Sequence, residues 1–435
     1  MSSCSDLIDV DPPVDSLVSF TIFESPKTAD AAVAGIYSTF YNQSYFSSDF
    51  TINVSAYVDE LTSLSATVNY FYENSLLATD SDVNTFWAQS YKLIYLSNSV
   101  IEGCENSTVL TDEEKGQFIG EAKFFRAFCH FYLLNYFGEV PLITSTEVQI
   151  INTQAASLKD PVYNQIIEDL IYARDYLPAD YSISFSDRTR VNSYVASAML
   201  ARVYLYNELW DLAETEATRV IEKTDLYTLN SLNDIFLSNS NEAIWQVYTR
   251  LGYTDFANEM VPLDTGGVPL YTINSYLLNT FEAGDQRKTN WIGSFDYSGE
   301  TYYYPYKYKT RTNVQTEQET ILRLGELYLI RAEARAEQND IAGAQEDLDA
   351  IRSRAELDPS SVTDQSSLLA AIQKERQVEL FCEWGHRFLD LKRTGNADSV
   401  LGTVKTGWNS TDILFPIPQE AISRNTNLNQ NEGYN

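Results

Sequence analysis

One segment near the end of the chain, residues 374–395 (KERQVELFCEWGHRFLDLKRTG), concentrates side chains that could do acid–base chemistry. Glutamate, histidine, arginine and aspartate are the residue types of a proton-transfer site. On a continuous helix the charged residues recur at steps of three or four and share one face: Arg376, Glu379, Glu383, Arg387 and Asp390. The same pattern describes a ladder of ion pairs that locks packed helices together. We favour the ladder, and we expect its removal to lower stability rather than to abolish a reaction.

The rest of the sequence offers little for catalysis or metal binding. His130 and His386 are the only histidines, which excludes a site with three histidine ligands. The chain lacks the HExxH, GxSxG, Walker and GxGxxG motifs, and its cysteines lack the CxxC spacing of a structural zinc site. Residues 80–84 (DSDVN) begin like a calcium loop, but no glutamate occupies the twelfth position, so a helix cap is the better interpretation.

We therefore expect no catalytic residue, no metal ion and no cofactor. A glycoside hydrolase needs only two carboxylates, and an acidic chain always supplies them. A hydrolase accordingly stays open as the less favoured alternative.

The charge balance restricts the possible partners. The chain has 61 acidic and 30 basic residues, a net charge of -31. Nucleic acid and anionic membrane surfaces attract positive charge, so we expect neither to bind this protein directly. Uncharged ligands such as neutral sugars are compatible with this charge.

Helical periodicity dominates the sequence and predicts an all-α scaffold. Residues 200–221 and 331–348 match the small and aromatic positions of tetratricopeptide repeats. A capping box at 111–114 predicts the start of a long helix that is apolar on nearly every side and ends near Gly138. Further helical hairpins are expected from two pairs of segments: 84–103 with 112–137, and 161–177 with 192–208.

Two irregular regions interrupt this scaffold. The segments NEAIWQVY and TYYYPYKYKT have the composition of short strands. We predict a single unit over residues 1–435: a helical scaffold mainly at 81–224 and 318–395, an irregular elaboration mainly at 38–80 and 225–315, and a tail at 396–435. The expected fold class is an all-α tetratricopeptide-repeat scaffold with a loop-rich region and a few short strands.

Several motifs in this order resemble the SusD/RagB family, the surface glycan-binding lipoproteins of Bacteroidetes. The resemblance covers almost the whole chain and is most specific in three segments: GEAKFFRAFCHFYLLNYFGEVPLI at 120–143, ERQVELFCEWGHRFLDLKRTG at 375–395 and LFPIPQEAISRNTNLNQNEGY at 414–434. It implies a non-catalytic receptor that captures oligosaccharide or polysaccharide and delivers it to a SusC-like TonB-dependent transporter for import. A RagB-like receptor for peptide import is the alternative that the sequence leaves open.

Cys4 is the residue that the resemblance makes a lipid attachment site. It opens the polar stretch CSDLIDVDPP, as lipoproteins of this family do once the signal peptide is removed. The charged and apolar regions of a signal peptide are absent from the sequence. We expect a protein held at the outer membrane, on the cell surface, only through a lipid on Cys4.

Aromatic side chains in the irregular regions are the candidates for sugar binding. Ring faces stack on pyranose rings, while amides and carboxylates bond the hydroxyls. In the first region, NYFYEN supplies Tyr70 and Tyr72, which point to the same side if the segment is extended, with Asn69 beside them. The expected ligand is a neutral glycan, and a glucan is one candidate.

The second irregular region supplies Trp291, Tyr297 and Tyr302, with Asp296 as a partner for sugar hydroxyls. Trp291 is the leading candidate, because a loop rich in Gly, Asn and Ser offers little core in which to bury an indole. Each of these residues also has a structural interpretation, in which its ring covers the scaffold.

Overall fold

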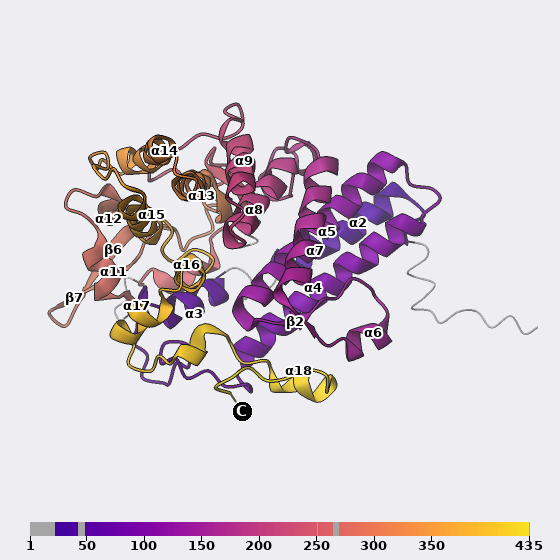
Figure 1. Cartoon of the computed structure of the whole chain (residues 1–435), viewed down its shortest axis with the longest axis horizontal. Coiled ribbons are helices and arrows are strands. Elements are labelled where there is room, and N and C mark those ends of the chain that lie inside the picture. Colours follow the sequence, from indigo (N-terminus) through magenta and orange to yellow (C-terminus); the bar gives the residue numbers. More distant parts are fainter. Residues whose placement is uncertain (1–21, 42–47, 250, 264–268, 435) are drawn as a thin grey trace, which may run out of the picture.

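Helices make up most of the part of the chain that the computed structural model describes, residues 22–41, 48–249, 251–263 and 269–434 (Figure 1). Cys4 and its predicted lipid lie outside these residues. The longer helices are, in chain order, α2 (Pro26–Tyr41), α4 (Ser81–Asn106), α5 (Asp112–Phe137), α7 (Lys159–Tyr176), α8 (Ser193–Tyr206), α9 (Trp210–Ile221), α13 (Leu324–Glu337), α14 (Ile341–Arg354) and α15 (Gln365–Glu379). Helices α2, α4, α5 and α7 form one side of the molecule, α13–α15 the other, and α8 and α9 lie between them (Figure 1). The all-α prediction is confirmed.

Shorter helices and strands connect and cover this scaffold. The short helices are α3 (Phe50–Tyr57), α6 (Val148–Thr153), α10 (Asp255–Met260), α11 (Ser275–Thr280), α12 (Gln286–Trp291), α16 (His386–Arg393), α17 (Ala397–Val404) and α18 (Gln419–Arg424), with 3-10 turns η2 (Ser182–Ser184) and η3 (Ser410–Ile413). Within the described residues the strands form antiparallel pairs: β1 (Leu61–Ser63) with β5 (Tyr271–Ile273), β2 (Val140–Pro141) with β3 (Ala156–Ser157), β4 (Ala243–Val247) with β8 (Glu319–Arg323), and β6 (Ile292–Tyr297) with β7 (Glu300–Pro305).

Helix α5 begins and ends as its sequence predicts. The Thr111 hydroxyl accepts from the backbone N–H of Glu114 at 3.2 Å, and the Glu114 carboxylate accepts from the backbone N–H of Thr111 at 2.9 Å. This reciprocal capping box satisfies two N–H groups that have no partner within the helix. At the other end Gly138 has φ of 75°, a conformation that glycine adopts without steric cost.

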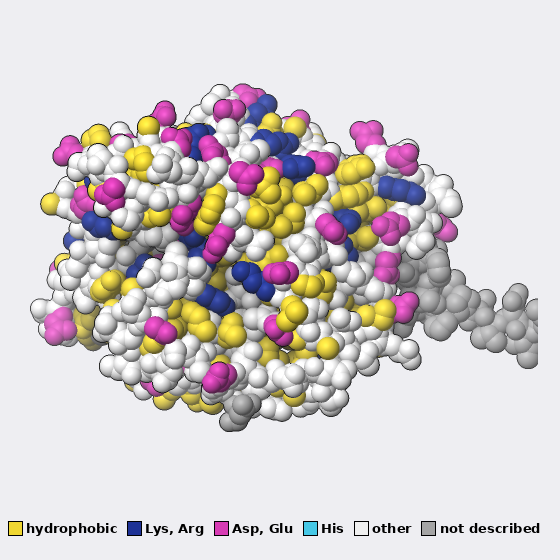
Figure 2. All heavy atoms as spheres, viewed as in Figure 1, with side chains coloured by type: hydrophobic (Ala, Val, Ile, Leu, Met, Phe, Trp, Pro, Cys, Tyr) yellow, Lys and Arg dark blue, Asp and Glu magenta, His cyan; other side chains and the backbone are white. Residues whose placement is uncertain are grey.

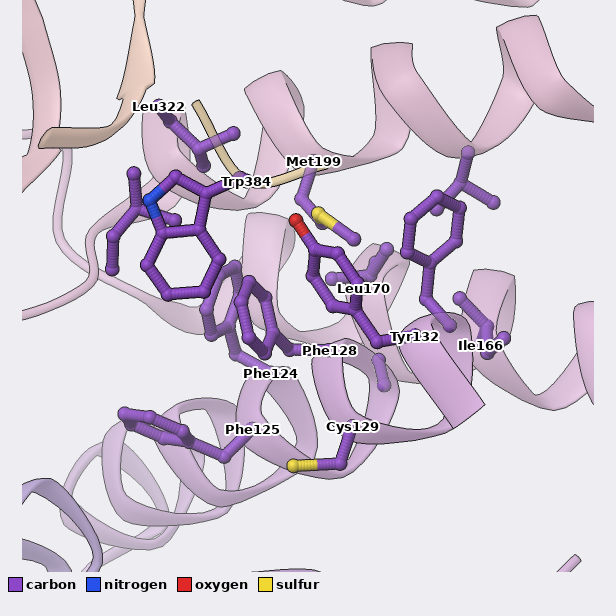
Figure 3. Packing of buried hydrophobic residues seen from close by; sticks show 14 of the residues in the cluster. Phe124, Phe125, Phe128, Cys129, Tyr132, Ile166, Leu170, Met199, Leu322 and Trp384 are labelled. Carbon is purple, nitrogen blue, oxygen red and sulfur yellow. The ribbon is translucent and has the colours of Figure 1, made fainter. Parts of the chain in front are cut away.

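Aromatic rings from α5 fill the largest core. Phe124, Phe125 and Phe128 are fully buried, and Trp384 from a distant turn points toward them (Figure 3). The ring centroids of Phe128 and Trp384 lie 5.8 Å apart at 75°, an edge-to-face contact. The core therefore ties the C-terminal third of the chain to the N-terminal helices.

The two predicted repeats form antiparallel helix pairs, α8 with α9 and α13 with α14, and α9 also packs against α13. Ala213 and Ala217 of α9 and Ala344 of α14 are fully buried, so the small side chains lie where the helices approach closely. Figure 2 shows acidic side chains scattered over one face of this scaffold rather than gathered into a site.

The segment 374–395 is not one helix, which corrects the expectation of a continuous charged face. Helix α15 ends, and a turn at residues 380–385 leads into α16. Cys382, Trp384 and Gly385 in this turn have φ of 52°, 45° and 71°, in the left-handed region that interrupts a helix. The interruption directs the Trp384 ring into the aromatic core.

Charged side chains around this turn form a buried ion cluster, which consists of Glu242, Asp285, Arg287, Lys307, Arg323, Arg354, Glu375, Glu379 and Glu383. Arg323 donates to Glu383 at 2.7 Å and to Glu379 at 2.5 Å. Lys307 donates to Glu383 at 2.5 Å and to the backbone carbonyl of Phe381 at 2.8 Å. The cluster therefore joins β8, the turn and the strand-rich region.

Other ion pairs of the segment also run between elements. Arg387 of α16 lies 2.6 Å from Asp59, which follows α3. Arg376 lies 2.8 Å from Asp390, across the turn. The charges hold segments together, as the structural interpretation expects, but the pairs do not follow a single helix face because the helix is interrupted.

Burial removes Glu379 and His386, the leading acid–base candidates of this segment, from contact with a substrate. Burial alone would raise the pKa of Glu379, but the guanidinium groups of Arg354, Arg323 and Arg287 hold that pKa well below its ordinary value. Burial, reinforced by surrounding cations, holds the pKa of His386 well below its ordinary value. Glu379 is thus ionised and His386 neutral near pH 7, and both are enclosed by protein.

In the described ranges, no helix is long and apolar enough to cross a bilayer. The same residues bring together no group of three or more His, Cys, Asp or Glu side chains arranged to hold a metal ion.

Candidate functional site

A groove of about 540 Å³, which we call the polar groove, opens beside the N-terminal end of α4. Its walls come from Asn53 of α3, the loop 65–71, the segment 77–82, and Leu270 with Tyr271. The groove thus joins the two irregular regions, which are about 200 positions apart along the chain.

The β1–β5 pair brings these two regions together. Ser63 pairs with Tyr271, and the backbone N–H of Leu64 donates to the carbonyl of Leu270 at 2.8 Å. The Asn69 amide then donates to the Tyr271 hydroxyl at 2.9 Å. Antiparallel pairing fixes the register, so the Tyr271 ring is held against the loop that carries Tyr70.

Asp80 positions the opposite wall. Its carboxylate accepts from the backbone N–H groups of Asp82 at 2.8 Å and Val83 at 3.2 Å, which confirms that residues 80–84 begin with a helix cap. Asn53 donates to the Asp82 carboxylate at 3.1 Å. Burial, and next the Asp80 carboxylate, raises the pKa of Asp82. Carboxylate and amide groups in this wall can bond hydroxyl groups of a ligand.

Apolar side chains are exposed at the rim of the groove. Val68, Leu77 and Leu270 are each about half exposed or more, and the Tyr70 ring is 42% exposed. Large hydrophobic side chains that gather around a polar depression indicate a surface for binding, because water solvates them poorly. Of the described residues that line the groove, Asp80 and Asp82 are charged and none is Lys or Arg. The groove therefore suits an uncharged ligand with apolar faces and hydroxyl groups.

The β6–β7 hairpin, residues 292–305, lies next to the groove through β5. Thr272 follows Tyr271 of the groove, and its hydroxyl donates to the carbonyl of Tyr303 at 2.6 Å. Phe295 pairs with Tyr302 across the hairpin, so Phe295, Tyr297 and Tyr302 share one face. The rings of Phe295 and Tyr297 are nearly parallel, at 15°, with centroids 6.4 Å apart.

Asp296 does not accompany these tyrosines, which corrects its predicted role beside them. Alternation along the strand places Asp296 on the opposite face of the hairpin from Tyr297 and Tyr302. Its carboxylate accepts from the Thr301 hydroxyl at 2.6 Å. Asp296 therefore closes the hairpin rather than serving the tyrosine face.

Trp291 is buried, so its prediction as the leading sugar-stacking residue is wrong for this structure. The side chain is 0% exposed, and the indole N–H donates to the carbonyl of Leu232 at 2.9 Å. Phe236 and Phe381 pack against the ring, and the Lys307 ammonium lies 4.8 Å from its centroid. The residue that appeared to lie in a loop ends helix α12 over a separate core cluster.

Tyr70 and Tyr72 do not point to the same side, because residues 70–74 form a turn and not an extended strand. Tyr70 faces the groove. Tyr72 is partly buried, and the Lys405 ammonium lies 4.1 Å from its ring centroid. Asn69 lines the groove and also shapes the turn, because its side-chain oxygen accepts from the backbone N–H of Tyr72 at 3.0 Å.

Tyr271, Asn53 and Asp82 belong to the site but were not predicted as parts of it. Tyr271 lies in the second irregular region and could have been considered with its other aromatic residues. Asn53 lies in a short helix that carries no signal of function. Only the pairing of β1 with β5 reveals that these residues surround Tyr70.

Two family models match the chain. The model described as "SusD family" matches residues 274–434, and the model described as "Starch-binding associating with outer membrane" matches residues 6–205. SusD-like protein P25 of Formosa agariphila is 22% identical over an alignment that covers 100% of this chain and 96% of that protein.

Solved structures show the same fold. A SusD superfamily protein from Bacteroides vulgatus superposes with a TM-score of 0.84 at 21% identity, covering 95% of this chain and 100% of the other. A structure titled "Laminarin binding SusD-like protein" gives a TM-score of 0.79 at 25% identity, covering 94% and 99%. The two family models, which match residues 6–205 and 274–434, and the relative aligned over the whole chain show that the chain belongs to the SusD/RagB family.

Proposed function

We propose that this protein is a non-catalytic receptor at the cell surface that binds a neutral oligosaccharide or polysaccharide in the polar groove. The observation that carries the proposal is the groove itself, where exposed Tyr70 and the Tyr271 ring stand beside the amides of Asn53 and Asn69 and the carboxylate of Asp80. Rings that stack on sugar faces and polar groups that bond hydroxyls are the two requirements of glycan recognition. The laminarin-binding relative supports the same class of ligand.

The charge of the groove supports a neutral glycan. Asp80 and Asp82 lie on its wall, and the whole chain carries a net charge of -31. A sulfated or uronic-acid polymer would meet like charges without a described cation in the groove to compensate. The β6–β7 hairpin is the second part of the proposed surface, with Tyr297 and Tyr302 on its ligand-facing side.

Titration calorimetry against a panel of neutral and sulfated glycans, laminarin among them, tests this proposal. We expect a neutral member to bind and Tyr70→Ala to weaken it by about 1–3 kcal/mol, without change in the melting temperature. Tyr248→Ala is the matched control, because Tyr248 is 51% exposed and lines neither of the cavities described here. Equal affinity in Tyr70→Ala and the control would remove Tyr70 from the site.

The same preparation separates this function from its alternatives. Release of reducing ends from a bound glycan by pure protein would overturn the non-catalytic assignment in favour of a glycoside hydrolase. Binding of peptides with no binding of any glycan would favour a RagB-like receptor for peptide import. Tighter binding of sulfated than of neutral glycans would contradict the prediction of a neutral ligand, but not the assignment as a glycan receptor.

Delivery to a SusC-like TonB-dependent transporter completes the proposal, with the receptor held at the outer membrane by a lipid on Cys4. Membership of the family supports both parts. Purification of the protein from native envelopes should recover a TonB-dependent barrel, and mass spectrometry should find an acylated Cys4. A Cys4→Ala precursor recovered wholly with the membrane would contradict the anchor.

A further inference from the structure

A second cavity lies on the other side of the first turn of α4. This α4–α18 cavity has a volume of about 360 Å³, and its walls come from α4, the β2 strand with the following segment, α6, and α18 with the tail beyond it. It is distinct from the polar groove, since the two share no lining residue.

Aromatic rings line the α4 side of the cavity. Trp87, Tyr91 and Tyr95 follow at steps of four, so they form a row along one face of the helix with about 6 Å of rise per step. The rings of Trp87 and Tyr91 lie 5.0 Å apart at 50°, and the Tyr91 hydroxyl donates to the carbonyl of Pro141 at 2.9 Å, which fixes the ring. Trp87 is 7% exposed, whereas Tyr95 is 45% exposed and presents its ring to solvent.

The opposite walls combine apolar side chains, among them Ile143, Ile151 and Leu428, with polar groups that are already held in place. Asn425 donates to the carbonyl of Gln154 at 2.8 Å, which joins the tail to the segment after α6. Glu420 and Arg424 of α18 pair with each other, so their charges cancel. Exposed Asn152 adds an amide at the rim. The cavity therefore combines an aromatic wall with amides and no net charge.

Two links connect the cavity to the polar groove. Within the first turn of α4, Asp82 lines the groove and Asn84 lines the cavity. The segment 77–79 borders the groove, and the carbonyl of Ala78 accepts from the backbone N–H of Gln419, where α18 begins, at 2.8 Å. A polymer bound in the groove needs to pass only the end of α4 to reach the cavity.

We propose that the α4–α18 cavity is a second sugar subsite, which binds a further part of the same neutral glycan. The aromatic row, in which Tyr95 is the most exposed ring, stacks on sugar rings, and the amides of Asn84 and Asn152 bond hydroxyls. The proposal rests on the proposed function, because it requires a glycan in the groove. It predicts that affinity increases with chain length until the polymer spans both sites, since the second contact is made within one complex.

Calorimetry with oligosaccharides of increasing length, prepared from the neutral glycan that binds, tests the subsite. Tyr95→Ala should weaken the longest oligosaccharides by about 2- to 10-fold and leave the shortest unchanged. Asn152→Ala should also weaken binding of the longest oligosaccharides, but by a smaller factor than Tyr95→Ala. Both side chains are exposed, so folding is preserved, and Tyr248→Ala again serves as the control.

The outcomes distinguish the two proposals. Failure of every glycan to bind the unaltered protein would overturn the proposed function and the subsite together. Binding with the same length dependence in Tyr95→Ala, Asn152→Ala and the control would overturn the subsite alone. If Tyr95→Ala keeps its glycan affinity but no longer co-purifies with the barrel, the sugar assignment of this cavity is overturned. This face would then be a docking surface for the transporter.

Discussion

In the buried ion cluster, Arg323 and Glu379 are withdrawn from water and bond each other, whereas in the polar groove Tyr70 and its neighbouring amides remain open to solvent. The cluster contains the residue types of a catalytic site, and the groove contains mainly rings, amides and hydroxyls. Residue type alone would make the cluster the better candidate for a functional site, but the burial of the cluster and the exposure of the groove favour the groove. Ion pairing within the cluster offsets the free-energy cost of burying its charges. In the groove, polar and aromatic side chains remain accessible and can bind a ligand.

The difference shows that accessibility decides the role of a side chain. Glu383 is buried and has two cationic partners within 3 Å, so a substrate cannot reach it. Asp80 caps helix α4 with its carboxylate, but it also lines the groove, where a ligand can contact it. Substitutions in the cluster should therefore change stability, and substitutions at the ligand surface should change binding.

Breaking the cluster should have the largest effect. Arg323→Ala leaves Glu379 and Glu383 short of their central partner, and we expect the free energy of unfolding to fall by about 3–5 kcal/mol. Urea denaturation measures this loss, and glycan affinity should persist in the folded fraction. Lys374→Ala is the control, since its pair with Glu282 is half exposed and should contribute no more than about 0.5 kcal/mol. Normal stability with abolished binding would place the cluster in the functional site.

Glu60, between α3 and β1, should give the protein a pH-dependent stability. Burial raises its pKa from 4.5 to about 7. The folded protein then holds this proton more tightly than the unfolded chain, so the contribution is complete below about pH 4.5 and is lost as the pH rises to about 7.

Glu60→Gln removes this contribution while keeping an oxygen that can accept from the backbone N–H of Cys382, which lies 3.1 Å from the carboxylate. We expect the variant to be more stable than the original protein by roughly 2–4 kcal/mol at pH 8 and similar to it near pH 4.5. Urea midpoints for both proteins at the two pH values measure the difference. A constant difference would show that Glu60 does not titrate in this range.

A substitution in the β6–β7 hairpin should have the smallest effect on glycan affinity, and it shows which face of the hairpin contacts the ligand. Tyr297→Ala should weaken glycan binding by about 0.5–1.5 kcal/mol, because one exposed ring is lost from the face shared with Tyr302. Tyr303 is matched in exposure, 38% against 39%, but lies on the opposite face, so Tyr303→Ala should leave affinity unchanged. Weaker binding by Tyr303→Ala and unchanged binding by Tyr297→Ala in calorimetry would place the ligand on the face of the hairpin that carries Asp296.

Local patterns predicted the scaffold well. The capping box at Thr111 and the positive φ of Gly138 define α5 from neighbouring residues, and the small residues of the repeats, such as Ala213, lie where α8 and α9 meet. These signals work because a helix is formed by contacts within four positions. The interruption at Trp384 escaped prediction, since its cause is a distant aromatic core that accepts the ring (Figure 3).

The candidate site could be predicted only in part. The loop with Asn69 and Tyr70 was identified, but Tyr271 and Asn53 were not, because strand pairing over a long separation brings them to it. Trp291 shows the opposite error. A polar stretch suggested exposure, yet α12 packs the indole against Phe236 from another part of the chain.

The sequence by itself determined the helical scaffold, its repeat positions and its membership of the SusD/RagB family, because periodicity, caps and ordered motifs are properties of neighbouring residues. Tertiary structure alone decided which aromatic rings face water and which charges find partners. Both depend on segments far apart in the chain, such as β1 with β5 and β8 with the turn after α15. Burial and pairing of this kind are set by the packed chain as a whole, and they separate the groove that can bind a ligand from the cluster that only stabilises the fold.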